Sequence, residues 1–239
     1  MNYDVIIVGA GPGGIFAAYE LSKKSPELKV AVFETGHSLE HRKCPIDGKK
    51  VKSCIKCKTC SIMSGFGGAG AFSDGKYNIT NDFGGTLHEY IGKEEAIELM
   101  QYVDDINMEY GGEGTKMYST AGTGLKKVCL QNKLHLLDAK VRHLGTDKNY
   151  VVLQNFYNAI KDKTDFHFDC PVTDIKAIDG GFEVTANDGV YTCKDCIISV
   201  GRSGSSWMEG LCKKLDIPTK SNRVDIGVRV ELPAEIFST

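Results

Sequence analysis

The sequence predicts an α/β fold in which a parallel sheet lies between two further layers, followed by the start of a second domain. Three observations favour this fold. A short apolar run at 4–8 opens the chain and enters a glycine-rich turn. A helical stretch at 15–22 and a second apolar run at 29–33 follow directly, as in a parallel strand–helix–strand unit. Between 172 and 193, short alternating runs separated by glycine-containing turns predict a β-meander.

The glycine-rich turn predicts a Rossmann-like dinucleotide-binding unit. Gly9 permits the tight turn, Gly11 lets a pyrophosphate approach the backbone, and Gly14 lets helix and strand pack closely. The helix behind the turn offers free N–H groups and a positive dipole end, while Glu34, after the second strand, can accept from ribose hydroxyls. The predicted contacts of this unit are Gly9, Gly11, Pro12, Gly13, Gly14 and Glu34.

The position of this motif at the start of the chain favours FAD over NAD. The stretch from 4 to 34 resembles the start of the glutathione-reductase-type FAD flavoproteins. The resemblance implies FAD as cofactor and a second FAD contact from Arg42. Judged from the residues alone, a solvated loop arginine explains Arg42 equally well.

The composition excludes several other classes of protein. The chain has 239 residues, 25% of them charged, with a formal net charge of −2, which is typical of a globular protein and gives no case for nucleic-acid binding. No run approaches the roughly 18 apolar residues of a membrane span. No basic segment or cleavage site precedes the first apolar run, so we expect a cytoplasmic protein.

A cysteine-rich loop follows the second strand and carries Cys44, Cys54, Cys57 and Cys60 among many lysines. Nearby positive charge stabilises thiolates, the form that binds metal or attacks disulfides. Three interpretations stay open: an iron–sulfur cluster, a structural zinc site, or a redox-active cysteine pair beside the flavin. The spacing resembles the ferredoxin run C-x2-C-x2-C without its usual fourth cysteine. The remaining cysteines are expected to pack as small hydrophobic residues.

The segment after the cysteines holds five glycines in twelve residues, interleaved with aromatic residues. This pattern predicts a packed loop whose backbone lies close to a ligand. Its run GFGGAGAFSDGKYN resembles a family of uncharacterised FAD-dependent dehydrogenases, as do the segments 141–147 and 224–231. The resemblance implies flavin-edge contacts from Ser73, Asp74, Gly75 and Lys76. A solvated turn is the alternative for Asp74 and Lys76.

The rest of the chain is expected to complete the fold. Helices at 93–110, 123–134 and 150–160 and a strand at 140–144 form an insertion, 93–163. The third parallel strand, 165–169, precedes the meander strands 172–179, 181–186 and 190–193, and a further buried strand, 194–200, ends at Gly201. By resemblance, Val172 contacts the adenine, and Gly201 and Arg202 contact the cofactor. The FAD-binding domain is expected to span 1–222, including the cysteine/glycine-rich loop 42–80, and 223–239 to begin a truncated substrate domain.

These expectations favour an FAD-dependent oxidoreductase that transfers hydride or electrons between flavin and a small molecule, with the cysteine loop as a redox relay. NADH or NADPH is the expected electron donor. The alternative is a non-catalytic dinucleotide-binding module whose metal–thiolate loop serves assembly or redox sensing. The sequence leaves the substrate, the electron acceptor and the oligomeric state open.

Overall fold

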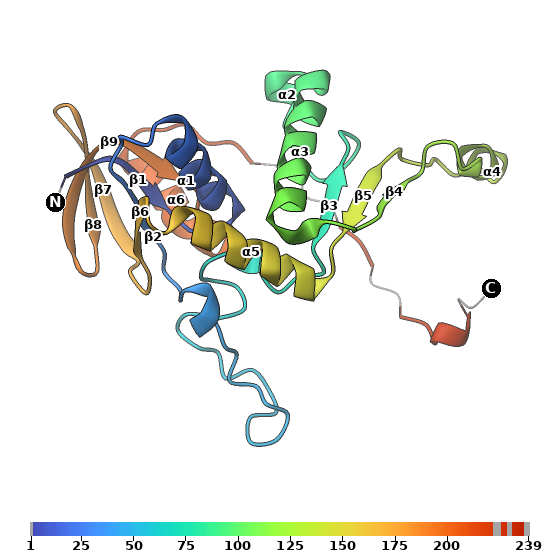
Figure 1. Ribbon diagram of the computed structural model, residues 1–239, viewed down its shortest axis with the longest axis horizontal. Coiled ribbons are helices and arrows are strands. Elements are labelled where there is room, and N and C mark those ends of the chain that lie inside the picture. The colour runs from blue at the N-terminus through green and yellow to red at the C-terminus, as the bar shows by residue number, and fades with distance from the viewer. Residues whose placement is uncertain (1, 222–225, 229–230, 237–239) are drawn as a thin grey trace.

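The computed structural model describes residues 2–221, 226–228 and 231–236 (Figure 1). Its main sheet has the strand order β6-β2-β1-β9-β8-β7. Strands β6, β2, β1 and β9 run parallel, and β9, β8 and β7 form an antiparallel meander. The strands of this sheet are β1 (Asn2–Val8), β2 (Val30–Phe33), β6 (Thr164–His167), β7 (Val172–Ile178), β8 (Gly181–Ala186) and β9 (Gly189–Ile198).

The last strand differs from the expectation. We predicted a meander strand at 190–193 and a separate parallel strand at 194–200, whereas β9 is continuous through both. One edge of β9 pairs antiparallel with β8 over 189–193, and the other edge pairs parallel with β1 over 192–198, so the two pairings overlap at Thr192 and Cys193. No turn separates the two pairings, so one strand belongs to both the meander and the parallel part of the sheet.

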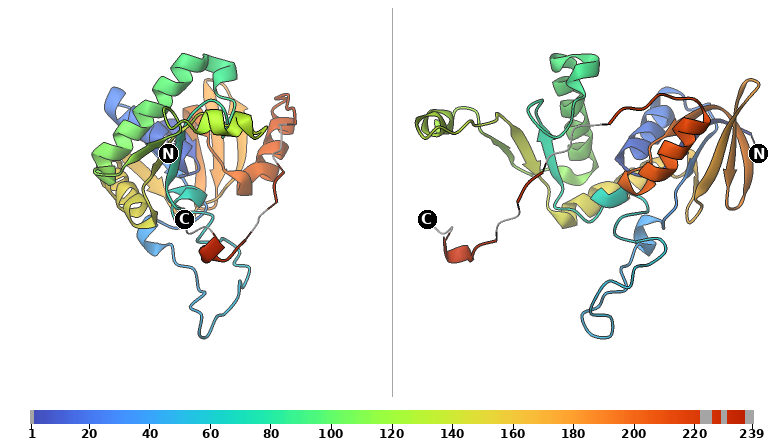
Figure 2. Two further views of the ribbon diagram at one scale, coloured as in Figure 1. Left: turned by 90° about the vertical axis from the view of Figure 1, so that its right-hand side faces the viewer. Right: turned by 180° about the vertical axis from the view of Figure 1, so that it is seen from behind.

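The sheet lies between two layers, as predicted. Alternate residues of β1 point to opposite faces: Val5 and Ile7 pack under α1 (Pro12–Lys24) and α5 (Thr146–Ile160), while Ile6 and Val8 face the other core. That second core is covered by the meander and α6 (Ser205–Lys214). In the left view of Figure 2, α1 and α5 lie on one side of the orange strands and α6 on the other.

A second, smaller sheet joins the predicted helical insertion to the glycine-rich segment. Strand β5 pairs antiparallel with β3 on one side and β4 on the other. Strand β5 confirms the strand predicted at 140–144, whereas β3 comes from the end of the glycine-rich segment, outside the predicted insertion 93–163. The elements of this part are β3 (Lys76–Ile79), α2 (His88–Ile91), α3 (Lys93–Asn107), β4 (Met117–Ser119), α4 (Leu125–Gln131) and β5 (Lys140–His143).

The strand expected at the start of a second domain, 225–231, lies outside the described residues at 225, 229 and 230. Its described residues, 226–228 and 231, are not in a strand. The domain boundary at 222 therefore stays a prediction. Among the helices of the described chain, none combines the length and the apolar character needed to cross a membrane.

A buried ion pair joins α3 to the small sheet. The guanidinium of Arg142 donates from Nε and Nη2 to the two oxygens of Asp104, both at 2.7 Å, and Asp104 is 1% exposed. The third nitrogen of Arg142 donates to the carbonyl of Thr115. The hydrogen bonds that Arg142 donates to Asp104 are the largest effect on its pKa, which they raise. Removing one partner of such a pair leaves an uncompensated charge in the interior.

We expect Asp104→Ala to lower the free energy of unfolding by about 3–5 kcal/mol, because the guanidinium of Arg142 would stay largely buried without its carboxylate. The neighbouring Asp105 is exposed, so Asp105→Ala is a matched control expected to change stability by less than about 0.5 kcal/mol. Urea denaturation followed by circular dichroism measures both. Equal effects of the two substitutions would contradict the assignment.

Candidate functional site

A cleft of about 940 Å³ opens at the carboxyl ends of the parallel strands β1, β2 and β9. Ligands of open α/β sheets bind at this edge, where the loops leave the strands. The lining includes seven of the predicted cofactor contacts, which come from the first turn, the end of β2 and the residues after β9. They are Gly9, Gly11, Pro12, Gly13, Glu34, Gly201 and Arg202.

The first turn has the geometry that its glycines predict. Gly9 adopts φ +101°, a conformation that disfavours other residues, and a Cβ on Gly14 would lie 1.9 Å from the Gly9 carbonyl oxygen. Gly11 precedes the first turn of α1, whose N-terminus has no side-chain cap, and Pro12 fills the first helical position. Free N–H groups at a helix N-terminus beside a cleft make a site for an anion such as a pyrophosphate.

Glu34 lines the cleft, but its carboxylate also holds the backbone together. One oxygen accepts the N–H of Ala10 at 2.7 Å, and the other accepts the N–H groups of Gly36 at 2.8 Å and Gly65 at 2.9 Å. The residue is 7% exposed. A carboxylate has about four acceptor sites, so one remains for a ribose hydroxyl.

Arg42 differs from both interpretations of its sequence position. It is 4% exposed and is not among the residues that line the cleft. Its guanidinium donates to the carbonyls of Ser61 and Ile62, both at 2.9 Å, and of Phe66 at 2.6 Å. Burial lowers the pKa of Arg42, and the Glu34 carboxylate opposes that shift. Arg42 therefore lies inside the cysteine/glycine loop, neither in the cleft lining nor in solvent.

The glycine-rich segment reaches the cleft, but through other residues than we predicted. Ser73, Asp74, Gly75 and Lys76 lie outside the cleft lining, at the start of β3. Asp74 and Lys76 are exposed and form an ion pair at 3.0 Å, as in the solvated-turn alternative. The segment 68–70 lines the cleft instead. Phe66 is fully buried, which confirms that this loop is packed. The residues of the loop that line the cleft are not the ones that we predicted.

Two further differences concern the strands. Val172, the expected adenine contact, begins β7 and is not among the lining residues. Ser199, which the sequence analysis missed, does line the cleft, and its hydroxyl donates to the carbonyls of Val8 at 3.2 Å and Gly9 at 3.0 Å. The sequence could have indicated Ser199 as a cleft residue, because it lies near the end of the buried strand that precedes Gly201.

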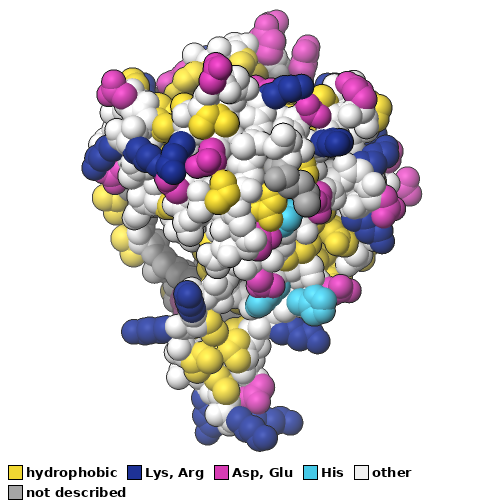
Figure 3. All heavy atoms as spheres, turned by 90° about the vertical axis from the view of Figure 1, so that its left-hand side faces the viewer, with side chains coloured by type: hydrophobic (Ala, Val, Ile, Leu, Met, Phe, Trp, Pro, Cys, Tyr) yellow, Lys and Arg dark blue, Asp and Glu magenta, His cyan; other side chains and the backbone are white. Residues whose placement is uncertain are grey.

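The cysteine loop projects from the rest of the chain toward the bottom of Figure 1. Cys44, Cys54, Cys57 and Cys60 are exposed free thiols, and Cys57 and Cys60 lie on the wall of the cleft. Figure 3 shows basic side chains gathered around this projecting segment, at the bottom of the view. Among the described residues, no three of the four thiols come within 4.8 Å of one another, and the iron–sulfur, zinc and redox-pair interpretations stay predictions.

Comparisons with known proteins bear on the fold. The model of the Thi4 family matches residues 1–40, and no curated protein matches. Glycine oxidase from Geobacillus kaustophilus aligns over 90% of this chain and 58% of its own, with 16% identity and a TM-score of 0.51. NikD, an unusual amino acid oxidase essential for nikkomycin biosynthesis, aligns over 90% and 54%, with 12% identity and a TM-score of 0.49.

The chain thus spans somewhat over half the length of these structures. The similarity to the glycine oxidase confirms the predicted fold class. This is a Rossmann-like α/β fold. Contacts with a cofactor stay predictions.

Gly14→Ala is expected to lower the free energy of unfolding by about 3 kcal/mol, because the new methyl group would overlap the Gly9 carbonyl and displace backbone. Gly13→Ala is the matched control. Its Cβ would lie 3.4 Å from the Ser199 side chain, an ordinary contact, and alanine favours the helix. Thermal unfolding of both variants measures the difference, and a Gly14 variant as stable as the Gly13 variant would refute the close approach.

Proposed function

We propose that this chain binds FAD in the cleft and belongs to an FAD-dependent oxidoreductase that moves hydride or electrons between the flavin and a small-molecule substrate. The observation that carries the proposal is the convergence of the glycine turn, the uncapped N-terminus of α1 and the Gly201 segment on one cleft. Its volume of about 940 Å³ lies at the upper end of the range of roughly 300–1,000 Å³ for ligand pockets, as an extended dinucleotide requires.

The residues of the cleft fit the parts of such a cofactor. The backbone N–H groups behind Gly11 would hold the pyrophosphate, and the remaining acceptor site of Glu34 would hold a ribose hydroxyl. Gly68, Gly70 and Gly201 have no side chain, so the cofactor could approach the backbone closely at these positions. FAD supplies the hydride and electron chemistry when bound, and the protein supplies position and electrostatics.

Cys57 and Cys60 give the site a second redox group. Both thiols are exposed on the cleft wall and belong to a Cys-x-x-Cys pair, the spacing found in disulfide oxidoreductases. We infer that this pair cycles between dithiol and disulfide, losing two electrons and two protons on oxidation, and exchanges those electrons with the cofactor site. NADH or NADPH is the proposed electron donor.

Gly11→Leu is expected to abolish FAD retention while leaving the fold intact. Gly11 has an ordinary φ of −75°, and a Cβ there would meet only Gly68, at 4.0 Å, so the leucine would fill the cleft rather than disturb the backbone. Gly210→Leu, on the exposed side of α6, is the control of equal volume and should keep FAD. The visible absorption spectrum after reconstitution with FAD and gel filtration measures retention.

A Gly11→Leu chain that keeps its FAD would overturn the cofactor site. The spectrum of the wild-type chain then tests catalysis. Bleaching of the bound flavin by NADH or NADPH, and its return with an added electron acceptor, distinguishes an oxidoreductase from a non-catalytic dinucleotide-binding module.

Anaerobic reduction of the oxidised protein with dithionite tests the cysteine pair. The wild-type chain should consume one electron pair for the flavin and a second pair for the disulfide. Cys57→Ser and Cys60→Ser should each remove the second pair without loss of FAD, whereas Cys129→Ser, outside the loop, should not. If the wild-type chain takes up a single electron pair, Cys57 and Cys60 do not form a disulfide that exchanges electrons with the flavin.

A further inference from the structure

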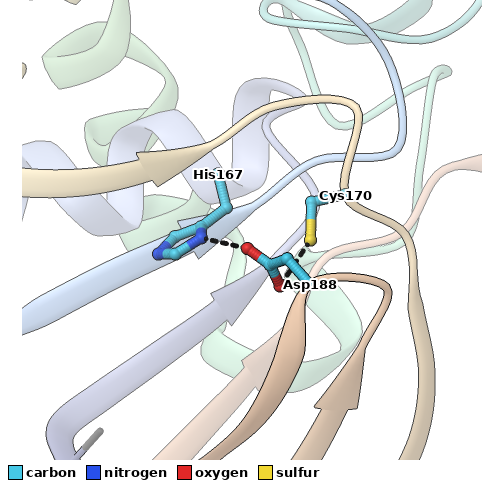
Figure 4. A group of neighbouring side chains, drawn as sticks. All are labelled: His167, Cys170 and Asp188. Carbon is cyan, nitrogen blue, oxygen red and sulfur yellow. Dashed lines mark hydrogen bonds and ion pairs between the residues drawn. The ribbon is translucent and has the colours of Figure 1, made fainter.

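A second cluster of reactive side chains lies away from the cysteine loop, where the end of β6 meets the hairpin between β8 and β9. It consists of His167, Cys170 and Asp188 (Figure 4). The imidazole Nδ1 of His167 lies 2.9 Å from Oδ2 of Asp188, and the thiol of Cys170 donates to Oδ1 of the same carboxylate at 3.0 Å. One ligand atom from each residue lies within 4.8 Å of the other two.

The histidine of this cluster is held in one orientation. Its ring stacks on Phe33 at a centroid distance of 4.3 Å and an angle of 16°. Its other nitrogen, Nε2, lies 3.5 Å from a carboxylate oxygen of Asp165 and 3.4 Å from the hydroxyl of Tyr3. Histidines that bind a metal through one nitrogen commonly donate from the other to a carboxylate, which fixes the ring and its tautomer. Asp165 is placed for that role, and Nδ1 is left facing Asp188.

The electrostatics of the cluster favour a cation. Two carboxylates, Asp165 and Asp188, lie next to His167, and the hydrogen bonds around them come from tyrosine, histidine and cysteine. The two oxygens of Asp188 face the His167 ring and the Cys170 thiol, so a cation placed among the three side chains would meet a carboxylate oxygen, an imidazole nitrogen and a sulfur.

We propose that His167, Cys170 and Asp188 bind a zinc ion through Nδ1, Sγ and one carboxylate oxygen, with water in the fourth position. Nitrogen, sulfur and oxygen are the ligand atoms that zinc takes in tetrahedral sites. Binding displaces the proton of the Cys170 thiol to solvent and involves no oxidation or reduction. His167 and Cys170 lie at and just after the end of β6, and Asp188 lies in the hairpin between β8 and β9, so the ion would fasten that hairpin to the end of β6. Metal binding at this site does not require the proposed flavin chemistry.

Co²⁺ is the probe for this site, because it replaces zinc and its bond to a thiolate gives a charge-transfer band. The chain is used with Cys44, Cys54, Cys57 and Cys60 replaced by serine, so that the loop cannot bind metal. We expect one equivalent of Co²⁺ with a thiolate band, displaced by Zn²⁺. Cys170→Ser should abolish the band, and Asp188→Asn and His167→Ala should weaken binding at least ~10-fold. Cys129→Ser is the control and should bind as before.

Two further readouts keep the test decisive if a variant folds poorly. Asp188 is exposed in a hairpin, so Asp188→Asn preserves shape and should still fold while losing the increase in melting temperature that Zn²⁺ gives the parent chain. In the chain with its loop cysteines intact, Cys170→Ser should remove one equivalent of bound Co²⁺. Absence of Co²⁺ binding by the loop-serine chain, or a thiolate band unchanged by Cys170→Ser, would overturn the proposal.

Discussion

The site depends on the hydrogen bonds that the carboxylate of Glu34 accepts from the backbone. A buried carboxylate is stable only when hydrogen bonds replace its hydration, and here three backbone N–H groups do so. They belong to three separate segments: the first turn at Ala10, the end of β2 at Gly36, and the cysteine/glycine loop at Gly65. One side chain therefore sets the distance between the glycine turn after β1 and the loop that forms the opposite wall of the cleft.

Arg42 completes this arrangement from the loop side. Its guanidinium lies near Glu34 and binds carbonyls at Ser61, Ile62 and Phe66, so it gathers the chain that follows the cysteines. The loop has little regular structure, and its order comes from these polar contacts and from Phe66 in the core. Cys57 and Cys60 lie just before the carbonyls that Arg42 binds. The position of Cys57 and Cys60 on the cleft wall thus depends on the buried guanidinium of Arg42 and on its hydrogen bonds to the loop.

The parts of the fold that local sequence patterns encode were predictable. The first turn, α1, β2 and the meander each follow from the periodicity and glycines of one short segment, and the structure confirms them. The positions of Arg42 and of 73–76 outside the cleft lining could not be predicted, because they depend on contacts with residues about twenty positions away or on the register of a loop. In the small sheet, β5 was predicted as the strand at 140–144, but β3 and β4 were missed, since they are short and pair with β5 from distant segments.

Glu34 also links the cleft to the proposed metal site, through its main chain. Its N–H donates to the carbonyl of His167, and its carbonyl accepts the N–H of Cys170, both at 2.9 Å. A metal that fixes His167 and Cys170 would therefore restrain the backbone from which the Glu34 carboxylate projects. Because coupling between two binding sites is reciprocal, any gain in cofactor affinity caused by the metal must equal the gain in metal affinity caused by the cofactor. The short path through one residue makes Glu34 the element through which such coupling would pass.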